Sequence, residues 1–523
     1  MTAASPSSTP PSPSLRRNTT YNAMSSLVAL VVGFFLAPIM LRHLGVDRFG
    51  FWSLIWAIAG SLALVDLRIS AAVTRFAAAA WARGEVPRLS RLASAGLAFY
   101  AVLGLLEVMG AAVLLLAPVR LPIEFPAAVA REGSLTLAAA VAVFAINSAG
   151  SVFVGLLQGL QRFDLTALIA TASTCLRAVG VVVVLGMGGG LPELVLVEGA
   201  IALIQGLVSY HQTRRLLPGL RLLPSWAAVS ALKELGAFGL KLQVAHLAHL
   251  VSFHGDKLLL SYFLGLPAVA FYELGSRIAY LMRGLPLLLV SAAGPTASTL
   301  EAGGDHARLW HLYLKGTAYL IVTGTPLLVF TAVGAGPILK VWLGADLPEA
   351  RLAAQVLAVG YYANLLSGMA YTVAVGIGRP ELEMRRSLFV AVLNLALSAS
   401  LIPLLGFAGA PLGTTLALIV GSLYLMGRFH AVFGQPLSAL ALRLRGPVLL
   451  ALPIAGAGWL VLQAGGRLGG GSWVTALTLL VHGTLVAAAY ATLAVRQGIV
   501  AGEDLRAAFA WAWMLRRQRQ AGR

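Results

Sequence analysis

The chain has 523 residues, of which 59% are hydrophobic and only 11% are charged, and its formal net charge at pH 7 is +18. A soluble domain carries about 25% charged residues, so this composition excludes a soluble fold of the same size. The excess positive charge lies mostly in short loops and tails, where membrane topology and anionic lipid headgroups explain it, and nucleic acid is not expected as a partner.

The chain opens with residues 1–17, which are rich in Ser, Thr and Pro and are predicted to form a disordered cytosolic tail. About fourteen apolar runs follow, each of the length that crosses a bilayer as a helix. The first six are expected at roughly 21–41, 50–73, 92–117, 134–157, 166–187 and 193–212. After a basic stretch, the others are expected at roughly 237–264, 268–294, 313–335, 351–376, 388–405, 410–430, 448–464 and 474–495.

The Lys and Arg residues predict the orientation of this bundle. With the N-terminus in the cytosol, most of them fall in cytosolic loops and tails, which is the bias that the positive-inside rule describes. Both termini are therefore expected in the cytosol, as an even number of spans requires.

A weak internal repeat predicts how the spans are grouped. Residues 44–52 read LGVDRFGFW and residues 264–272 read LGLPAVAFY, and each segment opens a new apolar run. Duplicated halves around a midplane site are common among secondary transporters, although such a turn could also be ordinary in membrane loops. The predicted parts are an N-terminal six-helix lobe at 18–213, a cytosolic linker at 214–235, a C-terminal six-helix lobe at 236–431, two additional helices within 432–496 and a basic cytosolic tail at 497–523.

The predicted helix at 237–264 is polar along one side. The residues that share this side are Gln243, His246, His249, His254, Asp256 and Lys257. Ionisable groups in hydrocarbon are costly, so they usually face a water-filled cavity or a partner. The favoured interpretation is a cavity wall for a hydrophilic or anionic substrate, and a hydrogen-bonded seam against another helix is the alternative. No metal site is expected, because the spacing typical of metal ligands is absent.

The next predicted helix, at 268–294, has a second polar face that contains Glu273, Arg277, Tyr280 and Arg283. Glu273 and Arg277 are four residues apart in the favourable order and can neutralise one another. Arg283 is then left as the unpaired cation deeper in the span. Arg68 in the second predicted helix is a further cation. It lies too deep in the span for its side chain to extend easily to the membrane–water interface.

Arg and Lys in a membrane cavity suit a phosphate, since Arg offers a two-pronged donor and Lys a point charge. No nucleophile elbow, phosphate loop, zinc motif or dinucleotide fingerprint accompanies them, so the chain is expected not to be an enzyme and to need no cofactor.

Four stretches resemble one family. They are LRHLGVDRFGFWSL at 41–54, LALVDLRISAAVTRF at 62–76, GLLQGLQRFDL at 155–165 and DKLLLSYFLGLPAVAFYELGSRI at 256–278. Together they resemble bacterial polysaccharide-export flippases, relatives of O-antigen translocases in the multidrug/oligosaccharidyl-lipid/polysaccharide superfamily. The resemblance covers about residues 20–430.

The resemblance implies an all-α polytopic fold of two six-helix lobes in an inverted V, as in multidrug exporters, with two extra C-terminal helices. It also implies a bacterial inner-membrane flippase that moves an undecaprenyl-diphosphate-linked oligosaccharide to the periplasmic leaflet by alternating access, for surface polysaccharide or exopolysaccharide synthesis. Asp256 and Lys257 match the family's acidic–basic pair, and Tyr272 matches its aromatic residue in the following helix. Arg68 departs from the family, which has Gly at that position.

On this interpretation each candidate residue has a role. The predicted diphosphate contacts are Arg68, Lys257, Arg277 and Arg283. The predicted sugar or cavity-wall contacts are Gln243, His246, His249, His254, Tyr272 and Tyr280. The candidates for ion coupling or for a cavity salt bridge are Asp66, Glu198, Asp256 and Glu273, with coupling to an H⁺ or Na⁺ gradient left open.

The expected partners are the polyprenyl-diphosphate-linked glycan, the lipid bilayer and other membrane proteins of polysaccharide assembly. Two alternative functions remain open. A cation-coupled multidrug exporter of the same fold would need acidic cavity groups, whereas cations predominate here. A membrane polysaccharide polymerase or ligase would need catalytic residues on a large periplasmic loop, whereas the predicted outer loops are short.

Overall fold

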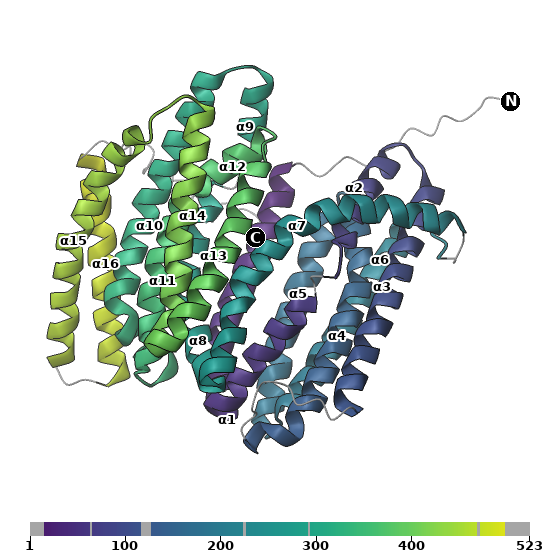
Figure 1. Ribbon diagram of the computed structural model, residues 1–523, viewed down its shortest axis with the longest axis horizontal. Coiled ribbons are helices and arrows are strands. Elements are labelled where there is room, and N and C mark those ends of the chain that lie inside the picture. The colour runs from purple at the N-terminus through teal and green to yellow at the C-terminus, as the bar shows by residue number, and fades with distance from the viewer. Residues whose placement is uncertain are drawn as a thin grey trace, which may run out of the picture. The chain divides into compact units, whose positions relative to one another are not determined.

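The computed structural model describes residues 15–62, 65–116, 127–222, 226–290, 293–467 and 471–496. Within these residues the chain is helical apart from short turns, and they contain no strand (Figure 1). The predicted all-helical fold is therefore confirmed. The predicted C-terminal tail and residues 1–14 of the predicted N-terminal tail lie outside the described residues.

Most of the predicted spans are present as membrane-length helices. Over the described residues, 10 helices or merged helices are long and apolar enough to cross a membrane. Met24–Leu62 and Glu381–Val432 each include more than one predicted span. Two helices outside this set contain most of the predicted site residues: α7 (Trp226–Leu264) has 39 residues and α8 (Leu266–Val290) has 25. Both exceed the roughly 20 residues that a membrane crossing needs.

The chain divides into two compact units, Met1–Leu250 and Val251–Arg523, which we call unit 1 and unit 2. The division falls inside α7. The predicted lobe and linker boundaries are not tested by this division and stay predictions.

Unit 1 contains the helices up to the first part of α7. They are α1 (Leu15–Leu62), α2 (Ile69–Ala82), α3 (Val86–Leu116), α4 (Ala127–Gly159), α5 (Phe163–Gly186) and α6 (Leu191–Leu216). Gly45, with φ 76° and ψ 174°, interrupts α1 between the first two predicted spans, a conformation that glycine adopts without steric cost. Helices α3, α4 and α6 run side by side in Figure 1. A Cβ on Gly150 of α4 would lie 3.1 Å from the Cα of Gly206 of α6, so small residues allow these two helices to approach closely.

The second predicted span, 50–73, is not one continuous helix. Its helix ends at Leu62 and resumes at Ile69, and the resumed helix continues to Ala82. Leu67 and Arg68 both have φ 51° in the intervening turn, a left-handed conformation that interrupts the helix. An apolar run predicts a helix from its composition. It does not show where packing against neighbouring helices stabilises a non-helical turn within that run.

Unit 2 contains the remainder of α7 and all later helices. Besides α8 they are α9 (Ala293–Ala302), α10 (His306–Leu343), α11 (Pro348–Leu366), α12 (Gly368–Gly376), α13 (Glu381–Leu405), a 3₁₀ turn η1 (Gly406–Ala408), α14 (Gly409–Val432), α15 (Ser438–Arg467) and α16 (Ser472–Arg496). Helix α13 packs along α14, and α8 packs along α11. The last two helices, yellow in Figure 1, pack against α10 and correspond to the two predicted additional helices.

Candidate functional site

The break between α1 and α2 places two predicted site residues, Asp66 and Arg68, on non-helical backbone. Left-handed φ angles cost non-glycine residues about 1–2 kcal/mol each, so neighbouring groups must hold the turn in place. Helix α7 packs directly on it: a Cβ at Gly239 would lie only 2.0 Å from the carbonyl oxygen of Leu67. One residue earlier, the ring of Phe238 lies 4.2 Å from the guanidinium carbon of Arg75 on α2.

Side chains from α2 and α3 fix the same turn. The hydroxyl of Tyr100 on α3 donates to Oδ1 of Asp66 and accepts from the backbone N–H of Ser70 at 3.3 Å. The hydroxyl of Ser70 donates to the carbonyl of Ser151 on α4 at 2.7 Å. The carboxyl group of Asp66 is thereby held at a defined position within unit 1.

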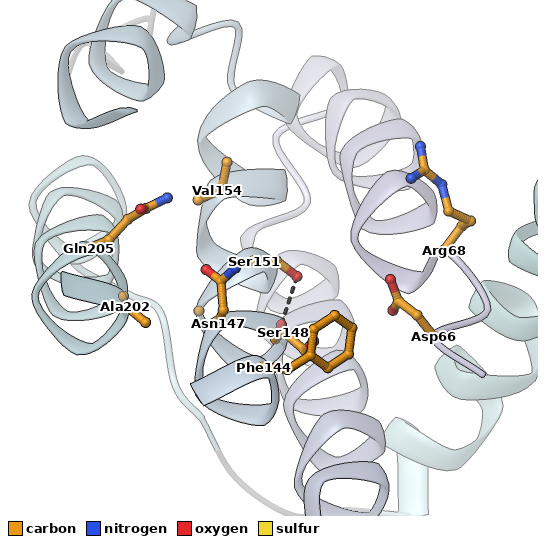
Figure 2. A pocket seen from close by; sticks show the side chains of 11 residues that line it. Asp66, Arg68, Phe144, Asn147, Ser148, Ser151, Val154, Ala202 and Gln205 are labelled. Carbon is orange, nitrogen blue, oxygen red and sulfur yellow. Dashed lines mark hydrogen bonds between the residues drawn. The ribbon is translucent and has the colours of Figure 1, made fainter. Parts of the chain in front are cut away.

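A cavity of about 360 Å³ opens beside this turn, bounded by α4 and α6 (Figure 2). Its polar lining consists of Asp66, Arg68, Asn147, Ser148, Ser151 and Gln205, and Phe144 and Val154 add apolar surface. Figure 2 shows the two charged side chains on the side of the break and the two amides on the side of α4 and α6. We call this cavity the unit 1 pocket.

The other predicted acidic candidate of unit 1, Glu198 on α6, lies in an ion pair. Its carboxylate accepts from Nε of Arg177 on α5 at 2.7 Å, and its side chain is 8% exposed. The partly exposed guanidinium of Arg177 neutralises the buried carboxylate, which would be costly to bury without a partner. Glu198 therefore links α5 to α6 in this structure.

A second polar site lies in unit 2, around Asp256 of α7, which is 1% exposed. Tyr272 of α8 donates to its carboxylate at 2.7 Å, and Thr414 of α14 donates at 2.6 Å. Two residues of α13 complete the set, with Ser398 at 2.8 Å and the amide of Asn394 at 3.3 Å from both oxygens. We call these five residues the Asp256 cluster.

Close helix packing makes the Asp256 cluster feasible. A Cβ on Gly413 of α14 would lie 2.6 Å from Oγ of Ser398, so glycine is needed where α14 meets α13. An ionised carboxylate offers about four acceptor positions, and donors from three neighbouring helices use them. The charge of Asp256 is thus buried with its hydrogen-bonding capacity satisfied.

Next to this cluster, Glu273 of α8 lies between two cations. Nζ of Lys257 is 2.6 Å from Oε2, and Nε of Arg277 is 2.7 Å from Oε1. The predicted pairing of Glu273 with Arg277 is therefore present, and Lys257 shares the same carboxylate. With two cations against one carboxylate, this group retains one net positive charge.

Arg283 lies two turns further along α8. Its Nε donates to the side-chain oxygen of Asn364 on α11 at 2.6 Å, and its guanidinium carbon is 5.8 Å from the ring centre of Tyr280. No carboxylate in the described part of the chain forms an ion pair with it. As predicted, Arg283 is a cation whose charge is not neutralised by its neighbours.

The predicted cavity-wall residues fall in different environments. Gln243 is 2% exposed, His254 is half-buried and Tyr280 is exposed. Tyr272 is 4% exposed, and its hydroxyl is directed at Asp256 and not at open space. The side chains of His246 and His249 lie outside the described ones.

Apart from Tyr272, sequence reasoning did not find the hydroxyl and amide groups of either site. Asn394 and Ser398 are spaced one helical turn apart in an apolar helix, a signal that could have pointed to a buried polar partner. Thr414, Asn147 and Gln205 carry no such signal, because single polar residues are common in membrane helices.

Two family models and a curated protein match parts of the chain. A family model described as polysaccharide biosynthesis protein matches residues 15–301, and a model described as MatE matches residues 244–399. The probable flippase AglR of Haloferax volcanii is 26% identical over 171 residues, which cover 32% of this chain and 36% of that protein. The chain thus matches only about a third of the length of this curated relative.

Solved structures share the fold over most of the chain. The inward closed conformation of the lipid II flippase MurJ is 14% identical with a TM-score of 0.71, and the match covers 91% of this chain and 99% of that one. An inward-facing multidrug resistance transporter of the MATE family in the MOP superfamily is 15% identical with a TM-score of 0.63, covering 79% and 95%. Identities this low show a common fold and nothing finer.

Proposed function

Because the chain belongs to the polysaccharide biosynthesis protein family, whose model matches residues 15–301, we propose that it flips a lipid-linked glycan across the bacterial inner membrane. The proposed cargo is an undecaprenyl-diphosphate-linked oligosaccharide repeat unit, which moves from the cytosolic to the periplasmic leaflet by alternating access. The product would serve surface polysaccharide or exopolysaccharide synthesis. The similarity of the chain to flippases supports this proposal.

The observation that carries the proposal is the excess of cations over carboxylates near the end of α7 and along α8. Lys257 and Arg277 share the carboxylate of Glu273, and among the described residues Arg283 is bonded to the neutral amide of Asn364 and to no carboxylate. An unneutralised guanidinium within a membrane span is costly, so it is retained where an anionic ligand compensates it. A diphosphate is such a ligand, since it accepts paired hydrogen bonds from a guanidinium.

The diphosphate group is therefore assigned to Arg283, Arg277 and Lys257 of unit 2, and the diphosphate role of Arg68 in unit 1 stays a prediction from the sequence. The sugar hydroxyls are assigned to the remaining polar side chains of α7 and α8. These are Gln243, His246, His249, His254 and Tyr280. Tyr272 is assigned to the Asp256 cluster instead, because its hydroxyl is already bonded there.

A second candidate function, export of cationic drugs, is favoured by the match of residues 244–399 to the MatE model. The electrostatics of α8 oppose it, because a cationic substrate would be repelled by an excess of guanidinium groups. The anionic lipid-linked glycan is thus the better fit to this helix.

The Asp256 cluster is proposed as the site that couples transport to an H⁺ or Na⁺ gradient. Its groups are a carboxylate, three hydroxyls and one amide, and hard cations prefer oxygen ligands of these kinds. A proton bound to Asp256 would neutralise the same buried charge.

Binding of farnesyl diphosphate to the detergent-purified chain tests the diphosphate role. We expect Arg283→Ala to weaken binding by about ten-fold or more, because a charge-assisted hydrogen bond contributes about 1.5–3 kcal/mol. Arg308→Ala is the matched control, since its side chain is 79% exposed at the start of α10. Equal affinity in the wild-type chain and Arg283→Ala would remove Arg283 from the proposed site.

A further inference from the structure

The unit 1 pocket has a lining that the diphosphate role does not explain. Asp66 and Arg68 contribute one negative and one positive charge, so the charged groups of the pocket sum to zero. The remaining polar groups are the neutral amides and hydroxyls of Asn147, Gln205 and two serines. A strongly anionic or cationic ligand would need an excess of the opposite charge, and the described lining has none.

The two amides are available to a ligand. Neither the amide of Asn147 nor that of Gln205 has a hydrogen-bond partner among the described residues, and Asn147 is exposed. A carboxamide both donates and accepts, which matches the hydroxyl groups of a sugar. Unpaired amides at membrane depth are costly in lipid, so their place on an open pocket indicates a polar occupant.

The remaining groups suit the same chemistry. Tyr100 donates to Oδ1 of Asp66 and leaves Oδ2 without a donor in the described part of the chain, so this oxygen can accept from a ligand hydroxyl. Phe144 lies in the same lining and offers an aromatic face to the apolar side of a sugar ring. The volume of about 360 Å³ is near the lower end of ligand-site volumes, roughly 300–1,000 Å³, which suits one ring and not a whole repeat unit.

We infer that the unit 1 pocket is a sugar-recognition subsite that binds one ring of the lipid-linked glycan through Asn147, Gln205 and Asp66. This inference rests on the proposed function and gives it a determinant of specificity.

The test compares two kinds of probe on the full-length chain in detergent. One is farnesyl diphosphate, and the other is the same lipid diphosphate carrying one hexose, one N-acetylhexosamine or one 6-deoxyhexose. The measured quantity is the ratio of the two dissociation constants. We expect at least one sugar to tighten wild-type binding by about ten-fold, and we expect this gain to disappear in the double variant Asn147→Ala, Gln205→Ala.

Gln212→Ala is the matched control, because Gln212 is two turns from Gln205 on α6 and does not line the pocket. It should retain the full gain, and all variants should bind bare farnesyl diphosphate as the wild-type chain does, which also shows that they are folded. The inference is overturned if no sugar of the panel tightens binding, or if the double variant keeps the gain. If the wild-type chain binds none of the probes, the proposed function itself fails.

Discussion

At the scale of single residues, the molecule places charges in two contrasting ways. Asp256 is buried with donors from three neighbouring helices, whereas Arg283 has one neutral partner and no carboxylate in the described part of the chain. A carboxylate that is fully bonded is stable without a ligand, and a guanidinium that is partly bonded gains from an anion. We therefore propose that Arg283 binds the anionic substrate, whereas the proposed ion coupling at Asp256 rests on the oxygen groups gathered around it.

Replacing Asp256 by Asn should separate these two roles. Asn removes the negative charge and brings an N–H₂ group against the hydroxyls of Tyr272 and Thr414, so a bound cation loses its main ligand. We expect Asp256→Asn to abolish stimulation of transport by an H⁺ or Na⁺ gradient in proteoliposomes, while farnesyl diphosphate affinity changes by less than about two-fold.

Thr484→Val serves as the control, because the hydroxyl of Thr484 bonds only a carbonyl of its own helix. Gradient-stimulated transport that persists in Asp256→Asn at the wild-type rate would exclude the Asp256 cluster as the coupling site.

At the scale of elements, the broken helix and α7 depend on one another. The turn with Leu67 and Arg68 is strained, and α7 approaches it so closely that only glycine fits at position 239. Phe238 packs on Arg75, and Glu234 pairs with Arg88 of α3 at 2.8 Å, so this part of α7 is held to α2 and α3 along its length. The unit 1 pocket therefore owes its shape in part to α7.

Gly239→Ala should destabilise unit 1 and distort the pocket. Its methyl group would lie 2.0 Å from the carbonyl oxygen of Leu67, so either α7 or the turn must move. We expect the free energy of unfolding to fall by about 1–3 kcal/mol, the usual effect of overpacking, measured by thermal unfolding in detergent.

Gly236→Ala is a stringent control for this substitution. A Cβ at Gly236 meets nothing within 4 Å, and alanine is the better helix former by about 1 kcal/mol. This variant should be neutral or slightly stabilised. Equal stability of the two alanine variants would show that the close approach of α7 to the turn is unimportant.

At the scale of the whole molecule, the chain divides into two compact helical units, and its orientation in the membrane is predicted from the distribution of charge. Basic residues gather where α6 ends, at Arg214 and Arg215, whereas the turn between α5 and α6 is rich in glycine. The positive-inside rule therefore predicts that the end of α6 lies in the cytosol. The proposed direction of transport depends on this orientation.

Cysteine labelling in intact cells tests the orientation. The native thiol, Cys175, is exposed and is first replaced by Ser. In that background Met187→Cys, at a side chain that is 83% exposed, should react with a membrane-impermeant maleimide, and Arg215→Cys should react only after the cells are opened. The reverse pattern would place the termini outside the cytosol.

The sequence alone determined the class of the molecule and the interactions within single helices. Composition excluded a soluble fold, apolar runs located most helices, and helical spacing placed Glu273 beside Arg277, because neighbours within one turn are fixed by the geometry of the helix itself. Only the tertiary structure showed that Asp256 meets Thr414 and Ser398, that the second span is broken beside Gly239, and that Asn147 and Gln205 line one pocket. These features depend on how separate helices are rotated and how closely they approach one another. Packing among many side chains determines both, and it produces no periodic pattern in the sequence.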